Sequence, residues 1–146
     1  MKLPRRALVL GLARSGQAAA LALARRGVPT RGVDRADGLD TGRLAEAGVE
    51  VHLGTEEEGL LDDVELLIKS PGVPGESPLP TAARVRGIPI WSEIELGVRL
   101  LRNPLVGITG TNGKTTTSEL LGAMFRAAGT PVAVAGKRAP TRSGRA

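Results

Sequence analysis

The 146-residue sequence contains no cysteine and no tyrosine, and it has one tryptophan, one phenylalanine and one histidine. Without cysteine there can be neither a disulfide nor a thiolate metal site. So few aromatic side chains leave little on which nucleic-acid bases could stack, which argues against a nucleic-acid-binding surface. The apolar stretch after the basic N-terminus is interrupted by Gly11 and Arg14, too early for a signal sequence or a membrane span. We therefore expect a cytoplasmic protein that contacts neither nucleic acid nor membrane.

The formal net charge of +5 is concentrated at the C-terminus. Residues 137–146 hold four basic side chains and no acid, so residues 1–136 carry a net charge of only +1. This segment also lacks any apolar period, and we expect a disordered basic tail. The nearly neutral remainder gives no electrostatic reason to expect a polyanionic partner.

Short apolar runs alternate with helical patterns, which is typical of βαβ units and a parallel sheet. Ser92 is placed to cap the helix that begins after it. The pattern predicts an α/β fold, with a Rossmann-like parallel sheet of five strands and helices on both faces. The expected strands are residues 7–11, 30–34, 49–53, 65–69 and 88–91, and the expected helices are residues 16–26, 41–47, 79–86 and 93–101.

The segment Arg102 to Pro104 is a predicted domain boundary, because Asn103-Pro104 breaks the preceding helix. Residues 1–102 then form the Rossmann-like domain, and residues 103–136 form the truncated start of a second domain. This second part is expected to hold a strand, a helix over 115–128 and a last apolar run at 131–135. So small a β–α–β unit cannot cover both faces of a sheet, and self-association through its uncovered edge is expected.

A glycine-rich turn, GITGTNGKTTT at 107–117, opens the helix of this second part. Backbone N–H groups and the helix dipole in such a turn point at an anion, which predicts a phosphate cradle. The loop is shorter than the usual G-x-x-x-x-G-K-[ST], since Ile108 stands where the first glycine would fall. Lys114 is placed to reach terminal phosphates, and Thr115 to hold Mg²⁺. A ligand-free turn before a surface helix is the less favoured alternative.

A second glycine turn, Gly11 to Gly16, lies where a dinucleotide fingerprint occurs in nucleotide-binding sheets. Ala13 replaces the middle glycine, and Asp34 ends the second strand where an acid binds a ribose hydroxyl. The turn Lys69 to Gly72 ends the fourth strand at the same edge of the sheet. NAD(P), a nucleotide in another pose and a turn without ligand all stay open from these residues alone.

Four segments, in this order, resemble the N-terminal part of the Mur ligases of peptidoglycan synthesis. The segment GITGTNGKTTT, with its shortened loop, is specific to the superfamily of Mur and folylpolyglutamate ligases. SPGVP with SEIELG resembles the member that adds D-glutamate. The resemblance covers residues 1 to about 136, and the segments are GLARSG at 11–16, KSPGVP at 69–74, SEIELG at 92–97 and GITGTNGKTTT at 107–117.

This resemblance implies that the first domain binds a UDP-sugar and the second binds ATP and Mg²⁺. The carboxylate of UDP-N-acetylmuramoyl-L-alanine would attack the γ-phosphate of ATP, and the amine of D-glutamate would displace phosphate from the resulting acyl phosphate. Lys114 is then the catalytic phosphate clamp and Thr115 a magnesium ligand. The implied contacts are Leu12, Ala13, Arg14 and Ser15 with the diphosphate and sugar, Asp34 and Arg35 with the uridine, Ser70, Pro71 and Gly72 with the ring, and Gly110, Thr111, Asn112, Gly113, Lys114, Thr115 and Thr116 with ATP.

The chain departs from the family after Gly136, where Asn-Ile-Gly is replaced by Lys137-Arg138-Ala139. We expect a frameshift or a truncation there, and a chain that does not catalyse ligation by itself. A non-catalytic nucleotide-binding module and an NAD(P)-binding domain are the alternative functions. His52, on an alternating strand, is expected to be structural, and the acids at 56–58 are expected to form a solvated helix start.

Overall fold

A computed structural model describes residues 3–135 of the chain. The chain divides into two compact units, and the division falls between Asn103 and Pro104. The division lies within the domain boundary predicted at residues 102–104. The function of each unit stays a prediction. The basic segment 137–146, expected to be disordered, lies outside the described residues.

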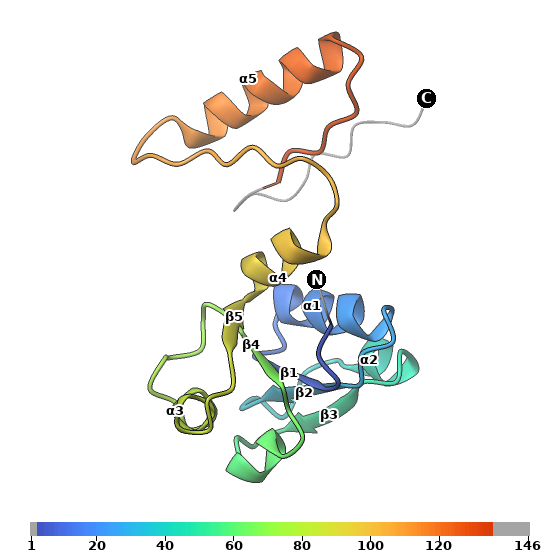
Figure 1. The fold of residues 1–146 in the computed structure, drawn as a ribbon, viewed down its shortest axis with the longest axis vertical. Helices are drawn as coiled ribbons and strands as arrows, with labels where there is room; N and C mark the ends of the chain where they lie inside the picture. The colour runs from blue at the N-terminus through green and yellow to red at the C-terminus, as the bar shows by residue number, and fades with distance from the viewer. Residues whose placement is uncertain (1–2, 136–146) are drawn as a thin grey trace. The chain divides into compact units, whose positions relative to one another are not determined.

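The first unit is built on a parallel sheet of five strands in the order β3-β2-β1-β4-β5 (Figure 1). β1 is central and all four of its residues are buried, as expected for a strand that is covered on both faces. The prediction of a five-stranded parallel sheet is confirmed. The strands are β1 (Ala7–Leu10), β2 (Thr30–Asp34), β3 (Glu50–Leu53), β4 (Leu66–Lys69) and β5 (Ile90–Ser92).

Helices cover both faces of this sheet, as the sequence predicts. Between the strands lie α1 (Arg14–Ala24), α2 (Gly42–Glu46), the 3₁₀ helix η1 (Glu58–Leu61) and α3 (Pro78–Val85), and α4 (Glu93–Leu100) follows β5. Ser92 caps α4 as expected, since its hydroxyl accepts the Glu95 N–H at 3.1 Å. α1 begins at Arg14, two residues earlier than the helix predicted from Gly16, because the extended Ala13 acts as its N-cap.

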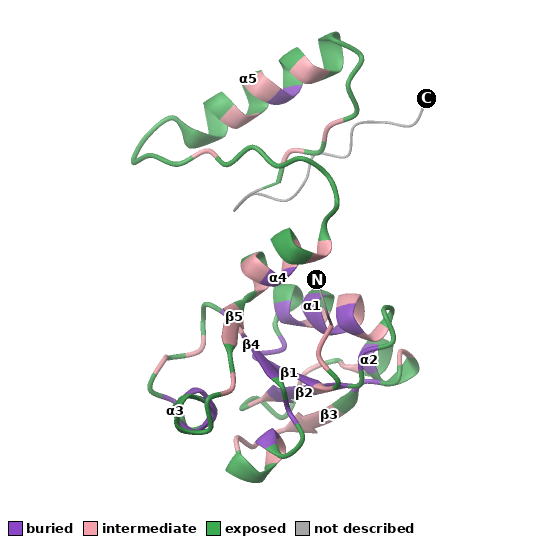
Figure 2. Ribbon diagram, in the orientation of Figure 1, coloured by how far each residue is buried: buried purple, intermediate pink, exposed green. Residues whose placement is uncertain are grey.

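Alternate residues of β1 feed two separate apolar clusters. Ala7 and Val9 join the cluster that includes side chains from α1, α2 and α4, whereas Leu8 and Leu10 join the cluster under η1 and α3. The period of two in a strand sends successive side chains to opposite faces of the sheet. Each fully buried leucine contributes about 2 kcal/mol to folding through apolar burial. The two clusters therefore hold the first unit together as three layers (Figure 2).

The second unit contains α5 (Lys114–Ala127) and, among its residues 104–135, no strand. The expected strand before the glycine turn and the expected apolar strand at 131–135 are therefore not formed. A strand requires a ladder of hydrogen bonds to a neighbour, and neither segment pairs in the described part. Gly122 is the one buried residue between 104 and 135, and a Cβ there would lie 2.5 Å from Val134 Cγ2.

No helix among the described residues has the length and apolar character needed to cross a bilayer.

Candidate functional site

The turn between β1 and α1 is closed so tightly that it needs two glycines. Gly11 has φ +92°, and a Cβ there would lie 2.7 Å from Ser70 Cβ. A Cβ on Gly16 would lie 1.8 Å from the Gly11 carbonyl oxygen. Real Cβ atoms do not approach other heavy atoms that closely, so neither position accepts a side chain without a shift of backbone. The backbone of this turn therefore lies directly against the loop that follows β4.

The N-terminus of α1 is open. Its N-cap, Ala13, has no side chain that can accept a hydrogen bond. Among the described residues, no protein group accepts the backbone N–H of Arg14, Ser15 or Gly16, whereas the N–H of Gln17 already bonds the Ala13 carbonyl. Unpaired N–H groups at the positive end of the helix dipole favour an anion.

Asp34, at the end of β2, braces the glycine turn. One carboxylate oxygen accepts the Leu12 N–H at 2.6 Å, and the other accepts the Ala36 N–H at 2.9 Å. This carboxylate thus already serves two backbone donors, although carboxylate oxygens can accept further bonds. The Leu12 side chain is buried in the core, where it contacts Gly32.

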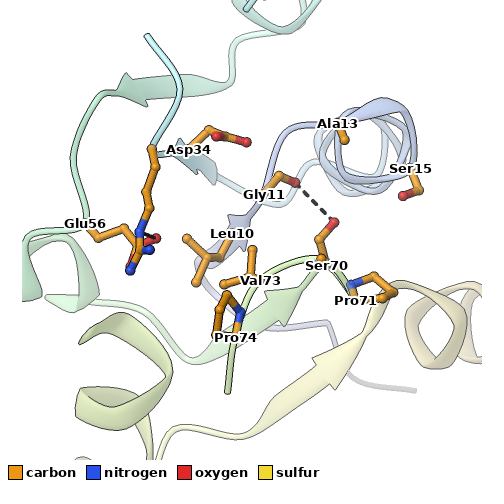
Figure 3. Close-up of a pocket in the computed structure, with 12 residues that line it drawn as sticks. Leu10, Gly11, Ala13, Ser15, Asp34, Glu56, Ser70, Pro71, Val73 and Pro74 are labelled. Atoms are coloured by element: carbon orange, nitrogen blue, oxygen red, sulfur yellow. Dashed lines mark hydrogen bonds and ion pairs between the residues drawn. The ribbon is translucent and has the colours of Figure 1, made fainter. Parts of the chain in front are cut away.

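Lys69 and Glu93 hold the loop after β4. The Lys69 ammonium donates to the carbonyls of Ser70 and Val73, at 3.1 and 2.7 Å. The Ser70 hydroxyl lies 3.4 Å from the Gly11 carbonyl oxygen (Figure 3). It also contacts the carboxylate of Glu93, in the first turn of α4. Side chains from β4 and α4 therefore fix this loop against the glycine turn.

These loops enclose a cleft of about 540 Å³ at the carboxyl ends of β1, β2 and β4. Seven of the residues that the sequence singles out line it: Ala13, Ser15, Asp34, Arg35, Ser70, Pro71 and Gly72. Two others do not line it: Leu12 is buried in the core, and Arg14 is exposed beside the cleft. The cleft thus gathers three loops that are far apart in the sequence, at the edge where ligands bind in open α/β sheets.

The cleft also contains residues that sequence reasoning missed. Glu56 was expected in a solvated helix start, but its side chain is 7 % exposed and its carboxylate lies 2.6 Å from Arg35 Nε. Glu57 and Glu58 are exposed, as expected. The pairing depends on the path of the loop after β3, and no spacing in the sequence indicates it. The other lining residues are Leu10, at the end of β1, Gly11, at the start of the predicted glycine turn, and Val73 and Pro74, in the segment KSPGVP.

A smaller cleft of about 270 Å³ adjoins β5. Lys69, Pro71, Ile90, Trp91 and Ser92 line it, so Pro71 borders both clefts. Trp91 is half-buried, and the guanidinium group of Arg99, in α4, lies over its ring at 4.3 Å from the centroid.

The glycine-lysine turn of the second unit leads into α5 through two glycines at positive φ. Gly110 and Gly113 adopt φ +145° and +76°, values that L side chains rarely adopt. Lys114 curls back so that its ammonium donates to the carbonyls of Gly110 and Thr111. Thr115, in the first turn of α5, is exposed, as are Thr111, Asn112 and Thr116. The turn and its uncapped helix start suit a phosphate chain.

In the described part of the chain no cluster of three or more histidine or acidic side chains could hold a metal ion. Neither cleft includes a residue of the second unit. The described residues of that unit thus offer a fit for phosphate groups, and a single hydroxyl ligand, Thr115, for Mg²⁺.

A parallel sheet of order 3-2-1-4-5, with an uncapped helix start and a cleft at the carboxyl ends of its strands, is the arrangement of Rossmann-like α/β domains. Comparison with known proteins narrows this class. The family "Mur ligase MurD-like, N-terminal domain" matches residues 5–92, and "Mur ligase middle domain" matches residues 108–145. The chain belongs to the Mur ligase family.

Curated relatives carry the name UDP-N-acetylmuramoylalanine–D-glutamate ligase. The protein of Shouchella clausii is 44 % identical over 135 residues, which is 90 % of this chain and 30 % of that protein. The protein of Anaeromyxobacter dehalogenans is 46 % identical over 124 residues, covering 82 % of this chain and 27 % of the relative. The chain therefore spans somewhat less than a third of the length of the relatives it matches.

Solved structures support the fold. A pseudomurein peptide ligase type C from Methanothermus fervidus superposes with a TM-score of 0.56 at 23 % sequence identity. The match covers 86 % of this chain and 26 % of the chain of that ligase. UDP-N-acetylmuramate-alanine ligase MurC from Thermotoga maritima has a TM-score of 0.59 at 22 % identity, covering 84 % and 29 %. At these identities the likeness concerns the fold alone.

Proposed function

We propose that this chain supplies the UDP-sugar-binding part of an ATP-dependent ligase that joins D-glutamate to UDP-N-acetylmuramoyl-L-alanine. The observation that carries the proposal is the cleft at the carboxyl ends of β1, β2 and β4, which opens beside the uncapped start of α1. Adjacent N–H groups at a helix start suit phosphate groups, such as those of a diphosphate. The substrate in this proposal is taken from the names of the relatives. The cleft is the place where we propose that it binds.

In this proposal each of the three loops binds a different part of the substrate. The N–H groups of residues 14–16 bind the diphosphate, with the Ser15 hydroxyl as a further donor. Asp34 and Arg35 contact the uridine, and the loop of Ser70 to Gly72 contacts the ring next to the diphosphate. Leu12 acts only indirectly, since its N–H is bonded to Asp34 and its side chain is buried.

The turn from Gly110 to Thr116 is proposed to bind the phosphates of ATP, with Thr115 as a ligand of Mg²⁺. Lys114 now bonds two carbonyls of its own turn, so its ammonium is already held over the loop where terminal phosphates would lie. There it would offset the charge that grows as the γ-phosphoryl group passes to the substrate carboxylate. The amine of D-glutamate then forms the amide as phosphate leaves. Such an enzyme works in the cytoplasm, in cell-wall synthesis and hence in cell division and cell shape.

The proposal is tested by isothermal titration of the 146-residue chain with UDP-N-acetylmuramoyl-L-alanine and, separately, with NADH. We expect binding of the UDP-sugar and none of NADH, because Ala13 stands where the middle glycine of the dinucleotide fingerprint lets a pyrophosphate approach the backbone. Binding of NADH without binding of the UDP-sugar would favour the NAD(P)-binding alternative and overturn the proposal. Binding of the UDP-sugar without ligation in the presence of ATP and D-glutamate leaves the chain as a nucleotide-binding module.

The second unit is proposed to self-associate. On α5, Leu120 and Met124 are spaced one turn apart and are 62 % and 59 % exposed. Leu105 and Val106 are also exposed, so the described residues of this unit present four large apolar side chains to solvent and bury only one residue. Covering them removes apolar area from water. Sedimentation should show a dimer, and a monomer for the variant with Leu120→Lys and Met124→Lys; a wild-type monomer would contradict this proposal.

A further inference from the structure

The main cleft has two chemically different ends. Ala13 and Ser15 lie at the start of α1 on one side, and Glu56 lies on the opposite side beyond Leu10 (Figure 3). The first end offers backbone N–H groups for phosphate. The second end has apolar walls and a charged pair, which suits a planar heterocycle with polar edges.

Glu56 and Arg35 form a two-pronged pair at this second end. Glu56 Oε1 lies 2.6 Å from Arg35 Nε, and Arg35 Nη2 donates to Oε2 at 3.3 Å. The Glu56 side chain is 7 % exposed, whereas that of Arg35 is 60 % exposed. A carboxylate is buried at a cost unless it is paired, and in the described part of the chain its partner is Arg35 alone. The carboxylate is thus the buried member of the pair and the guanidinium is the exposed one, and both residues line the cleft.

We propose that Glu56 is a positioning residue. It fixes the plane of the Arg35 guanidinium, so that the remaining N–H donors of this group form one wall of the cleft and give the cleft a preference for a uracil base. This inference rests on the proposed function, since it concerns the nucleoside end of the same ligand. A guanidinium has five N–H donors and no acceptor. In the pair with Glu56, the Nη2 donor bonds one carboxylate oxygen, and Nε lies 2.6 Å from the other. The donors left over can meet only acceptors. Uracil carries a carbonyl oxygen at C4, where cytosine carries an amino group, so a wall of donors favours uracil.

Without the carboxylate, Arg35 would lose this fixed plane. Its side chain is long and mostly exposed, and nothing else in the described residues bonds it. It would then turn toward water, and the distinction between an acceptor and a donor at C4 would weaken. Binding of the diphosphate at the other end of the cleft would be little affected.

The test compares the dissociation constants of UDP and CDP, which share the ribose and the diphosphate, by calorimetry on the full chain. For the wild type we expect UDP to bind about tenfold more tightly, the worth of about one charge-assisted hydrogen bond at an exposed site. Glu56→Gln should reduce this ratio to about twofold while leaving CDP binding nearly unchanged. Glu57→Gln, which removes the neighbouring exposed acid, should keep the wild-type ratio.

Arg35→Lys provides the second variant, since lysine keeps the charge but lacks the fork. It should lower the ratio as Glu56→Gln does, and the double variant should lower it no further, because both changes act through one guanidinium. An unchanged ratio in folded Glu56→Gln overturns the inference, as does an equal loss of UDP and CDP binding, which indicates a structural role. If Glu56→Gln does not fold, an unchanged ratio in Arg35→Lys overturns it. A wild type that binds neither nucleotide overturns the proposed function itself, and this inference with it.

Discussion

Gly16→Ala should damage the first unit more than any glycine substitution on a helix surface, because its Cβ has no room. The new atom would lie 1.8 Å from the Gly11 carbonyl oxygen, against the 3 Å or so below which such contacts do not occur. A carbonyl oxygen cannot rotate away as a side chain does, so the turn and the start of α1 must separate by more than an ångström. Overpacking of this kind costs about 3 kcal/mol, and the better helix propensity of alanine offsets up to ~1 kcal/mol. The net loss is about 2 kcal/mol.

Gly97→Ala is the matched control. Gly97 also lies in a helix, α4, but a Cβ there meets no atom within 4 Å. This variant should gain about 0.5–1 kcal/mol from helix propensity alone. Urea unfolding followed by circular dichroism gives both free energies, and Gly16→Ala should also lower the thermal midpoint by about 10 °C.

Binding adds a second readout to the same pair of variants. Separation of the turn moves the N–H groups of residues 14–16, so Gly16→Ala should weaken binding of the UDP-sugar where Gly97→Ala leaves it unchanged. The reasoning is refuted if Gly16→Ala is as stable as the wild type, or if the two alanine variants change stability in the same direction.

Two further predictions concern single polar contacts. The side-chain hydrogen bonds from His52 and then Arg31 lower the pKa of Glu50 below its usual value of 4.5, so this carboxylate adds stability above about pH 4.5 that is lost as the pH falls through its lower folded pKa. Because the side chain is half exposed, the loss is below ~1 kcal/mol, and urea unfolding at pH 3 to 7 should show it in the wild type but not in Glu50→Gln. Ser92→Ala removes the hydroxyl that accepts the Glu95 N–H and should lower the free energy of unfolding by about 1 kcal/mol. A variant whose free energy of unfolding lies within about 0.2 kcal/mol of the wild type, roughly a fifth of that effect, would show that the cap contributes nothing.

The sheet was predictable from the sequence because its signal is local. β1 and β4 are short apolar runs, followed by Gly11 and by Ser70-Pro71, and parallel strands buried on both faces are expected to have such sequences. The position of the cleft was predictable too, since the carboxyl ends of parallel strands share one edge. Asp34 and Ser70 could therefore be assigned to one site although 36 residues separate them.

What the sequence did not reveal depends on contacts between loops. The burial of Glu56 results from the path of the loop after β3, which brings its carboxylate to Arg35. The hydrogen bonds from Lys69 to the carbonyls of Ser70 and Val73 likewise depend on how the loop after β4 folds back. In the second unit, an apolar run alone predicted strands at 131–135, but a strand needs a neighbouring strand, and pairing is a property of the tertiary fold.

Trp91 provides this protein with an intrinsic optical probe. It is the only tryptophan of the sequence, which has no tyrosine, so the indole fluorescence of the protein reports on one place. Its ring lies under the guanidinium of Arg99 and borders the small cleft that shares Pro71 with the main one. A ligand that displaces the loop of Pro71 therefore alters the surroundings of the indole, and occupancy can be followed without any label.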